Sequence, residues 1–201
     1  MQIPIGPDHW LEPLLAEAVD AALGDWGLQF GTVWTARSID TGARDVGVDL
    51  DAPRTWMMTR LGLCTRTLLP LHVWVSEEVP RSIIAGLGFV ELPDGDFGEE
   101  GVGMLAELSN LMAGSMSRVM GEHVEGLRIT QRVGDIETRL LCALPPCRAL
   151  GVAACDAVCT FRLEASDGQT ALLRFALPRA AVEVFERDLG DAGGQEVRRA
   201  A

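Results

Sequence analysis

The chain has 201 residues, of which 48% are hydrophobic and 23% are charged, a composition that can bury a globular core. Its formal net charge is −12, its 17 basic residues are all arginines, and no basic run occurs, which argues against nucleic acid and anionic membranes as partners. No stretch approaches the roughly 18 apolar residues of a membrane span, and residues 1–10 lack the pattern of a signal peptide, so we expect a cytoplasmic protein.

The first half of the chain predicts an opening helix followed by strands. Asp8 is placed to cap a helix that runs to about Leu23, where the run GDWG is expected to end it. Runs rich in β-branched and aromatic residues then predict strands at 30–36, 45–51, 55–63 and 66–76. Ser76 is a candidate N-cap for a short helix within 76–89, which Gly86 or Gly88 would end.

The second half predicts a long helix and a further set of strands. A loop over 92–101 leads into a helix from about Glu99 to Met120, ended by Gly121. Strands are predicted at 125–133, 136–144, 155–165 and 169–177, with a tight turn at SDGQ, and Pro178 opens a closing helix. The order predicts a single α+β domain over 1–189, a mostly antiparallel sheet with two or three helices packed on it, and a disordered tail over 190–201.

The long predicted helix contains Asn110, the only asparagine in the chain. Helical spacing does not place it on the apolar face, which carries Leu108, Met112 and Met116. It shares a narrow outward stripe with four other residues: Gly103, Glu107, Gly114 and Arg118. Each glycine there costs roughly 1 kcal/mol relative to alanine. The stripe is therefore either a low docking surface with two polar side chains, or a solvated face whose glycines serve helix packing inside the protein.

The run ELSNLMAGS within this helix resembles the E-x-x-N motif of the CheC/CheX/FliY family of chemotaxis phosphatases. The E-x-x-N-x-x-x-G form of the CheX type matches Glu107, Asn110 and Gly114. The order of the predicted elements over about residues 8–177 is similar too: an opening helix, strands, a short helix, the motif helix and further strands. The resemblance therefore implies a CheX-like α+β fold.

The resemblance also implies an activity, hydrolysis of the aspartyl phosphate of a CheY-like response-regulator receiver domain. Asn110 would hold a water in line with the phosphorus, and Glu107 would pair with a cation of the receiver. Gly103, Gly114 and Arg118 would bind the partner. The receiver would supply its own Mg²⁺, so the resemblance implies no metal or cofactor of the chain's own. CheX-type proteins pair through their sheets, which implies a homodimer.

Two departures from the family pattern support a second hypothesis. Gly103 stands where members often have a small polar or acidic residue, and Val133 replaces a proline that many members carry. Only one E-x-x-N is present, so the two-site CheC arrangement does not fit. The second hypothesis is a non-catalytic adaptor on the same fold that binds a receiver or a flagellar component without hydrolysis.

Four clustered cysteines raise a third and weaker hypothesis, a metal or redox centre. Their spacing, C-x4-C-x7-C-x3-C from Cys142 to Cys159, matches no metal pattern. Cys155 and Cys159 alternate onto one face of a predicted strand, which is typical of small core residues. The three histidines, His9, His72 and His123, are scattered and are interpreted as structural or surface residues. The acidic loop over 92–101 lacks the spacing of a calcium loop.

Overall fold

A computed structural model describes residues 3–4, 11–39, 54–64, 68–88, 98–123, 128–141, 155–178, 182–183 and 187. The described helices are α1 (Leu11–Phe30), α2 (Glu78–Gly86) and α3 (Gly98–His123). The strands are β1 (Ile3–Pro4), β2 (Trp34–Ile39), β3 (Arg54–Cys64), β4 (Leu68–Ser76), β5 (Arg128–Leu141), β6 (Cys155–Ala165) and β7 (Thr170–Pro178).

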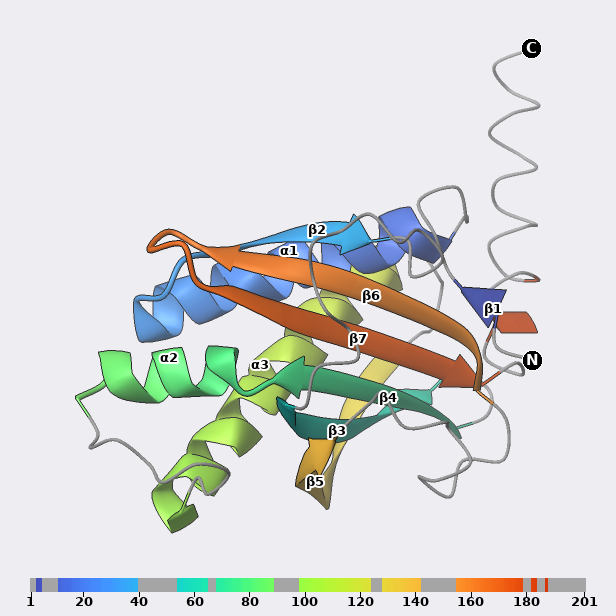
Figure 1. Ribbon diagram of the computed structural model, residues 1–201. Helices are drawn as coiled ribbons and strands as arrows, with labels where there is room; N and C mark the ends of the chain where they lie inside the picture. The colour runs from blue at the N-terminus through green and yellow to red at the C-terminus, as the bar shows by residue number, and fades with distance from the viewer. Residues whose placement is uncertain are drawn as a thin grey trace.

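The strands form one sheet in the order β1-β6-β7-β4-β3-β5 (Figure 1). Strand β2 pairs with β6 as well. Every pairing is antiparallel except the short contact of β1 with β6. The prediction of an α+β fold with a mostly antiparallel sheet and up to three helices is therefore confirmed.

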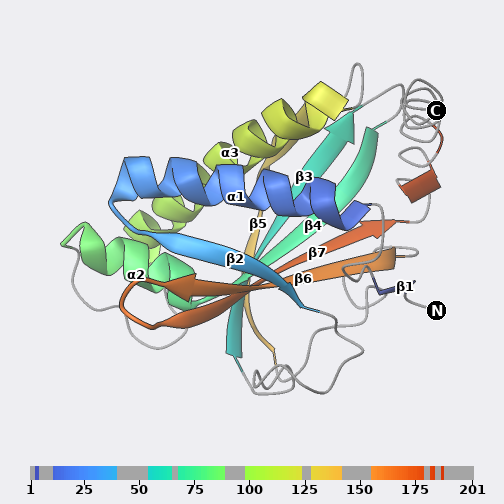
Figure 2. The ribbon, with the colours of Figure 1, turned by 90° about the horizontal axis from the view of Figure 1, so that it is seen from above.

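Helices α1 and α3 lie side by side across one face of the sheet (Figure 2). The main core fills the space between this helix layer and the sheet. From α1 it receives Leu15 and Trp26, and from α3 Met112 and Met116, all at most 1% exposed. The period of these residues matches the helical spacing of one buried face, which leaves the opposite face of each helix in solvent.

The opening helix is longer than the sequence predicts, because GDWG does not end it. Helix α1 continues through Gly24 and Gly27 to Phe30. Trp26 is fully buried, and its indole Nε1 donates a hydrogen bond to the Leu108 carbonyl of α3 at 3.2 Å. This tertiary contact outweighs the low helix propensity of the two glycines. The chain turns only at Gly31, whose positive φ of 70° suits glycine.

Other local predictions are also wrong, since α3 continues past Gly121 to His123 and β2 begins at Trp34 instead of residue 30. The predicted strands at 125–133 and 136–144 are one strand, β5, which pairs with β3 on both sides of a register shift between Thr59 and Leu61. Such an irregularity lets one long strand continue past an interruption in its pattern. Ser76 does not cap α2, because its buried hydroxyl accepts a hydrogen bond from the backbone N–H of Leu172 at 2.8 Å.

Several predictions concern segments that the structure does not describe. The predicted strand over 45–51, most of the loop over 92–101 and the tail over 190–201 lie outside the described residues. Of the predicted closing helix, only Val182, Glu183 and Arg187 are described.

Candidate functional site

The rotation of α3 about its axis is fixed by two buried polar contacts. Ser109 is fully buried, and its hydroxyl shares a 2.7 Å hydrogen bond with the hydroxyl of Thr59 on β3. The Leu108 carbonyl accepts the hydrogen bond from Trp26 on α1. Because Leu108 and Ser109 are held inward, the residues before and after them, Glu107 and Asn110, must face outward.

Glu107 and Asn110 are both exposed on α3, as the helical spacing predicts. Neither side chain forms a hydrogen bond or an ion pair with another described residue. A carboxylate and a carboxamide thus stand about one helical turn apart on the outer surface of the helix layer, with their polar groups available to a partner.

The two glycines of the stripe are also open. Gly103 and Gly114 are exposed, and a Cβ atom added to either would meet no other atom within 4 Å. The described helices and strands therefore do not use these glycines for close packing, and the interpretation of the stripe as an internal packing face loses its support. We call Gly103, Glu107, Asn110, Gly114 and Arg118 the α3 stripe.

Arg118 is exposed but is not isolated. Its Nη2 lies 3.2 Å from Oδ2 of Asp25 on α1, and 59% of its side chain is accessible. The same Asp25 oxygen accepts a 2.5 Å hydrogen bond from the hydroxyl of Ser115. Sequence reasoning missed Asp25, because the predicted helix ended before it and placed the residue in a turn.

The helix layer is strongly acidic. Within α1 and α3 the sequence places four carboxylates on each helix, and Arg118 is the only lysine or arginine. Its guanidinium is therefore the one permanent positive charge of this layer, beside a histidine at the end of α3. His123 has its Nε2 3.2 Å from Glu17 Oε2 of α1, on the surface as predicted.

The described cysteines give no support to a metal centre. Cys159 is fully buried in the core beside Phe161 and Leu163, and burial, with a smaller contribution from Glu12, raises the pKa of its thiol to about 12. A thiol with so high a pKa is a poor metal ligand and nucleophile at neutral pH. No group of three potential metal ligands occurs among the described residues, while Cys142 and Cys147 lie outside them.

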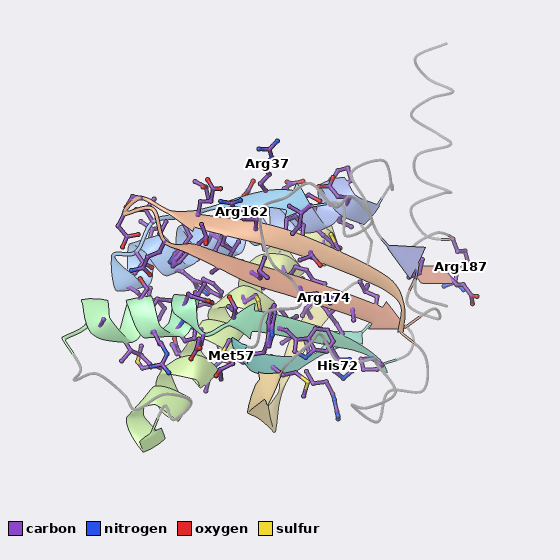
Figure 3. All side chains as sticks on the ribbon, viewed as in Figure 1. Arg37, Met57, His72, Arg162, Arg174 and Arg187 are labelled. Carbon is purple, nitrogen blue, oxygen red and sulfur yellow. The ribbon has the colours of Figure 1, made fainter. Side chains whose placement is uncertain are left out.

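The remaining residues singled out by the sequence are structural where they are described. His72, labelled in Figure 3, is fully buried on β4. Its ring stacks on that of Trp74, with ring centroids 5.9 Å apart. Trp34 and Trp56 are also buried in their strands. His9 lies outside the described residues. None of the described helices is long and apolar enough to cross a membrane.

Neither a protein-family model nor a curated protein matches this sequence. The fold does match solved structures. FliY from Thermotoga maritima has a TM-score of 0.66 at 11% identity, over 90% of this chain and 94% of that one. FliM from H. pylori, solved in complex with SpeE, has a TM-score of 0.61 at 10% identity, over 90% and 92%. The chemotaxis protein CheX from Vibrio vulnificus has a TM-score of 0.53 at 12% identity, over 82% and 98%.

These likenesses define the class of fold to which the chain belongs. It has the α+β fold shared by CheX, FliY and FliM structures, and the resemblance to the CheC/CheX/FliY group is confirmed at the level of fold. Because the same fold serves FliM as well as CheX, the function has to be argued from the α3 stripe.

Proposed function

We propose that the protein is a phosphatase that hydrolyses the aspartyl phosphate of a CheY-like response-regulator receiver domain. The observation that carries the proposal is the exposure of Glu107 and Asn110 on α3 with no partner among the described residues, between two glycines whose surface is open. Polar side chains held ready on a rigid helix fit a site whose remaining parts come from a partner.

Asn110 would position the attacking water. Its carboxamide can accept one hydrogen bond from the water and donate another, and it stays neutral beside a phosphoryl group. The water oxygen forms a bond to phosphorus as the bond from phosphorus to the aspartyl oxygen breaks, and the products are inorganic phosphate and a free carboxylate. Holding that water in line is most of what phosphoryl transfer requires of a protein.

Glu107 would orient the docked helix. Its carboxylate, about one turn from Asn110, is placed to pair with a cationic side chain of the receiver. The bare surfaces at Gly103 and Gly114 would let the receiver backbone approach the helix closely. The receiver would supply Mg²⁺ to neutralise the charge that develops on the phosphoryl oxygens, so no metal of this chain is required.

The second candidate is a non-catalytic adaptor on the same fold. The observation in its favour is the likeness to FliM, which was solved in complex with SpeE and whose TM-score of 0.61 exceeds the 0.53 of CheX. An adaptor would use the same exposed stripe to bind a receiver or a flagellar component and would leave the acyl phosphate intact.

Phosphate release from a phosphorylated receiver separates the two candidates. The receivers encoded in the same genome are phosphorylated with a small-molecule phosphodonor in the presence of Mg²⁺, and release is followed with the wild type and with Asn110→Ala. A phosphatase accelerates release from at least one receiver, and Asn110→Ala removes that acceleration.

Binding without accelerated release by the wild type would favour the adaptor. Equal acceleration by wild type and Asn110→Ala would remove Asn110 from the mechanism. Arg37→Ala is a suitable control, because Arg37 projects from β2 into solvent away from the helix layer (Figure 3).

The proposal includes a homodimer that pairs through the sheets and a cytoplasmic location, where receiver domains act. Light scattering during size-exclusion chromatography tests the first by giving the molar mass in solution, and a monomer mass at all concentrations would contradict it. Cell fractionation tests the second.

A further inference from the structure

The ion pair between Asp25 and Arg118 lies on the exposed surface of the helix layer, about two helical turns along α3 from Asn110, and has no part in the proposed chemistry. We propose that Asp25 is a positioning residue, which holds the Arg118 guanidinium in place to bind a carboxylate on the surface of the docked receiver. This inference rests on the proposed function and adds a residue that sets the choice of partner.

Asp25 itself is held in place from two sides. The next residue, Trp26, is fully buried and donates a hydrogen bond to the Leu108 carbonyl. This hydrogen bond holds α1 against α3 next to Asp25. Ser115, only 2% exposed, donates to Asp25 Oδ2 at 2.5 Å. The Ser115 hydroxyl also lies 2.8 Å from the Leu111 carbonyl, but its single proton favours the charged acceptor. The carboxylate therefore has a defined position before any partner arrives.

Arg118 is restrained by this carboxylate and still has donors to offer. One guanidinium nitrogen, Nη2, contacts Asp25 Oδ2, and 59% of the side chain is accessible. A guanidinium carries five N–H donors in a fixed plane, so a second carboxylate can bind the remaining ones. Because the side chain is already ordered, less conformational entropy is lost when the partner binds.

The position of Arg118 along α3 excludes a direct role in the chemistry. It lies about 12 Å from Asn110 along the helix axis, at about 1.5 Å per residue, so one phosphoryl group cannot contact both side chains closely. The ligand of Arg118 must then be a different group on the receiver surface. Since all other fixed charges of α1 and α3 are negative, the layer as a whole favours a basic surface, and Arg118 selects a receiver that carries one acid opposite it.

Steady-state kinetics with the wild type, Arg118→Ala, Asp25→Asn and the double variant test the inference. Asn at position 25 keeps an oxygen acceptor for Ser115 but loses the charge that holds Arg118. We expect Arg118→Ala to raise KM about fivefold, the size of one accessible ion pair, and Asp25→Asn to raise it about twofold, with kcat unchanged in both. The double variant should match Arg118→Ala alone, because Asp25 acts only through Arg118.

Salt dependence and stability distinguish positioning from a structural role. The wild-type KM should rise with ionic strength more steeply than that of Arg118→Ala, since one attractive pair is lost. Arg37→Ala, which removes the same charge from β2, should leave KM unchanged. A KM for Arg118→Ala equal to that of the wild type overturns the inference, and so does an Asp25→Asn effect that adds to that of Arg118→Ala.

The inference stays testable if the phosphatase activity itself is absent. The same four proteins are then titrated with a receiver activated by beryllofluoride and Mg²⁺, and Kd replaces KM. The pattern of fivefold, twofold and non-additive changes in Kd supports the role of Asp25 in an adaptor, whereas unchanged Kd values overturn it independently of catalysis.

Discussion

Helices α1 and α3 present outward stripes with the same spacing but different chemistry. On α1 the stripe consists of Pro13, Glu17, Asp20, Gly24 and Leu28, which we call the α1 stripe. All five positions are exposed, as are the five corresponding positions of the α3 stripe. Gly24 resembles Gly114 in having nothing within 4 Å of an added Cβ. By exposure and by this glycine the two helices are equivalent, whereas Pro13 takes the place of Gly103.

The differences lie in the functional groups. Asp20 puts a carboxylate where α3 has the carboxamide of Asn110, and a carboxylate repels a phosphoryl group. Glu17 lies 3.2 Å from His123, whereas Glu107 has no described partner. Leu28, 88% exposed, takes the place of Arg118. The α3 stripe is therefore set apart from the α1 stripe by its neutral amide, by an acid with no partner among the described residues, by a second glycine and by its arginine.

The largest expected effect comes from giving α3 the chemistry of α1. Asn110→Asp keeps the size of the side chain but places a negative charge against the phosphoryl group and removes a donor. We expect kcat for receiver dephosphorylation to fall by about 100-fold, the scale of a misplaced reactant. Single-turnover phosphate release measures this directly. Activity within a few-fold of the wild type would mean that the difference between Asp20 and Asn110 is unimportant.

The next effect compares the two glutamates. Glu107→Gln should raise KM about tenfold, because a charged hydrogen bond to the receiver worth about 1.5 kcal/mol is lost. Glu17→Gln is the matched control on α1 and should leave KM unchanged. Both variants are assayed over a range of receiver concentrations. Similar changes in KM for the two variants would place the docking surface over both helices.

Replacing the glycines by alanine should have a smaller effect, which increases stability but weakens binding of the receiver. Gly114→Ala and Gly24→Ala should each raise the free energy of unfolding by up to about 1 kcal/mol, since neither Cβ meets another atom. Only Gly114→Ala should also raise KM, because its methyl group would stand where the receiver is proposed to dock. Urea denaturation and kinetics on the same preparations measure both. A Gly114→Ala variant that is more stable with unaltered KM would contradict a close backbone approach.

The smallest effect concerns the acid of the α1 stripe. Although Asp20 is exposed, partial desolvation of its carboxyl raises its pKa above the usual 3.8, so the folded chain binds this proton more readily than the unfolded chain. The contribution of Asp20 to the free energy of unfolding therefore falls as the pH rises from its pKa in the unfolded chain to its higher pKa in the folded chain. Asp20→Asn removes this pH dependence and should stabilise the fold at pH 7 by less than about 0.5 kcal/mol, because water screens an exposed carboxylate. Urea denaturation at pH 7 and at pH 4 checks this, and the advantage should shrink at the lower pH.

The helical period was enough to predict the α3 stripe, because the exposure of Glu107 and Asn110 depends only on which residues of the same helix are apolar. The strand pattern was likewise enough for β3, β4, β6 and β7. What the sequence could not provide was the pairing of segments far apart. Gly24 and Gly27 predicted the end of the first helix, but the hydrogen bond from Trp26 to the Leu108 carbonyl of α3 stabilises its continuation. Because the predicted helix ended too early, the contact of Asp25 with α3 was missed.

Buried polar contacts were equally invisible in the sequence. In the sequence, nothing distinguishes Ser109 from other polar residues of the helix or Thr59 from other residues of the strand. Their hydrogen bond exists only because α3 crosses β3 at that level, which is a property of the packed layers. Local patterns predict the face that a residue occupies, while the partner on that face is decided by tertiary structure.

The contacts that join α1 to α3 also have a consequence for folding. The bond from Trp26 to Leu108 spans 82 residues of chain, and the contact of Glu17 with His123 spans 106. Closing loops of this length is slow relative to forming either helix. During synthesis α1 must wait until α3 has been made before it gains its partner. A chain truncated before α3 would expose the apolar side of α1, and only a chain that has closed these loops can present the α3 stripe to the proposed receiver.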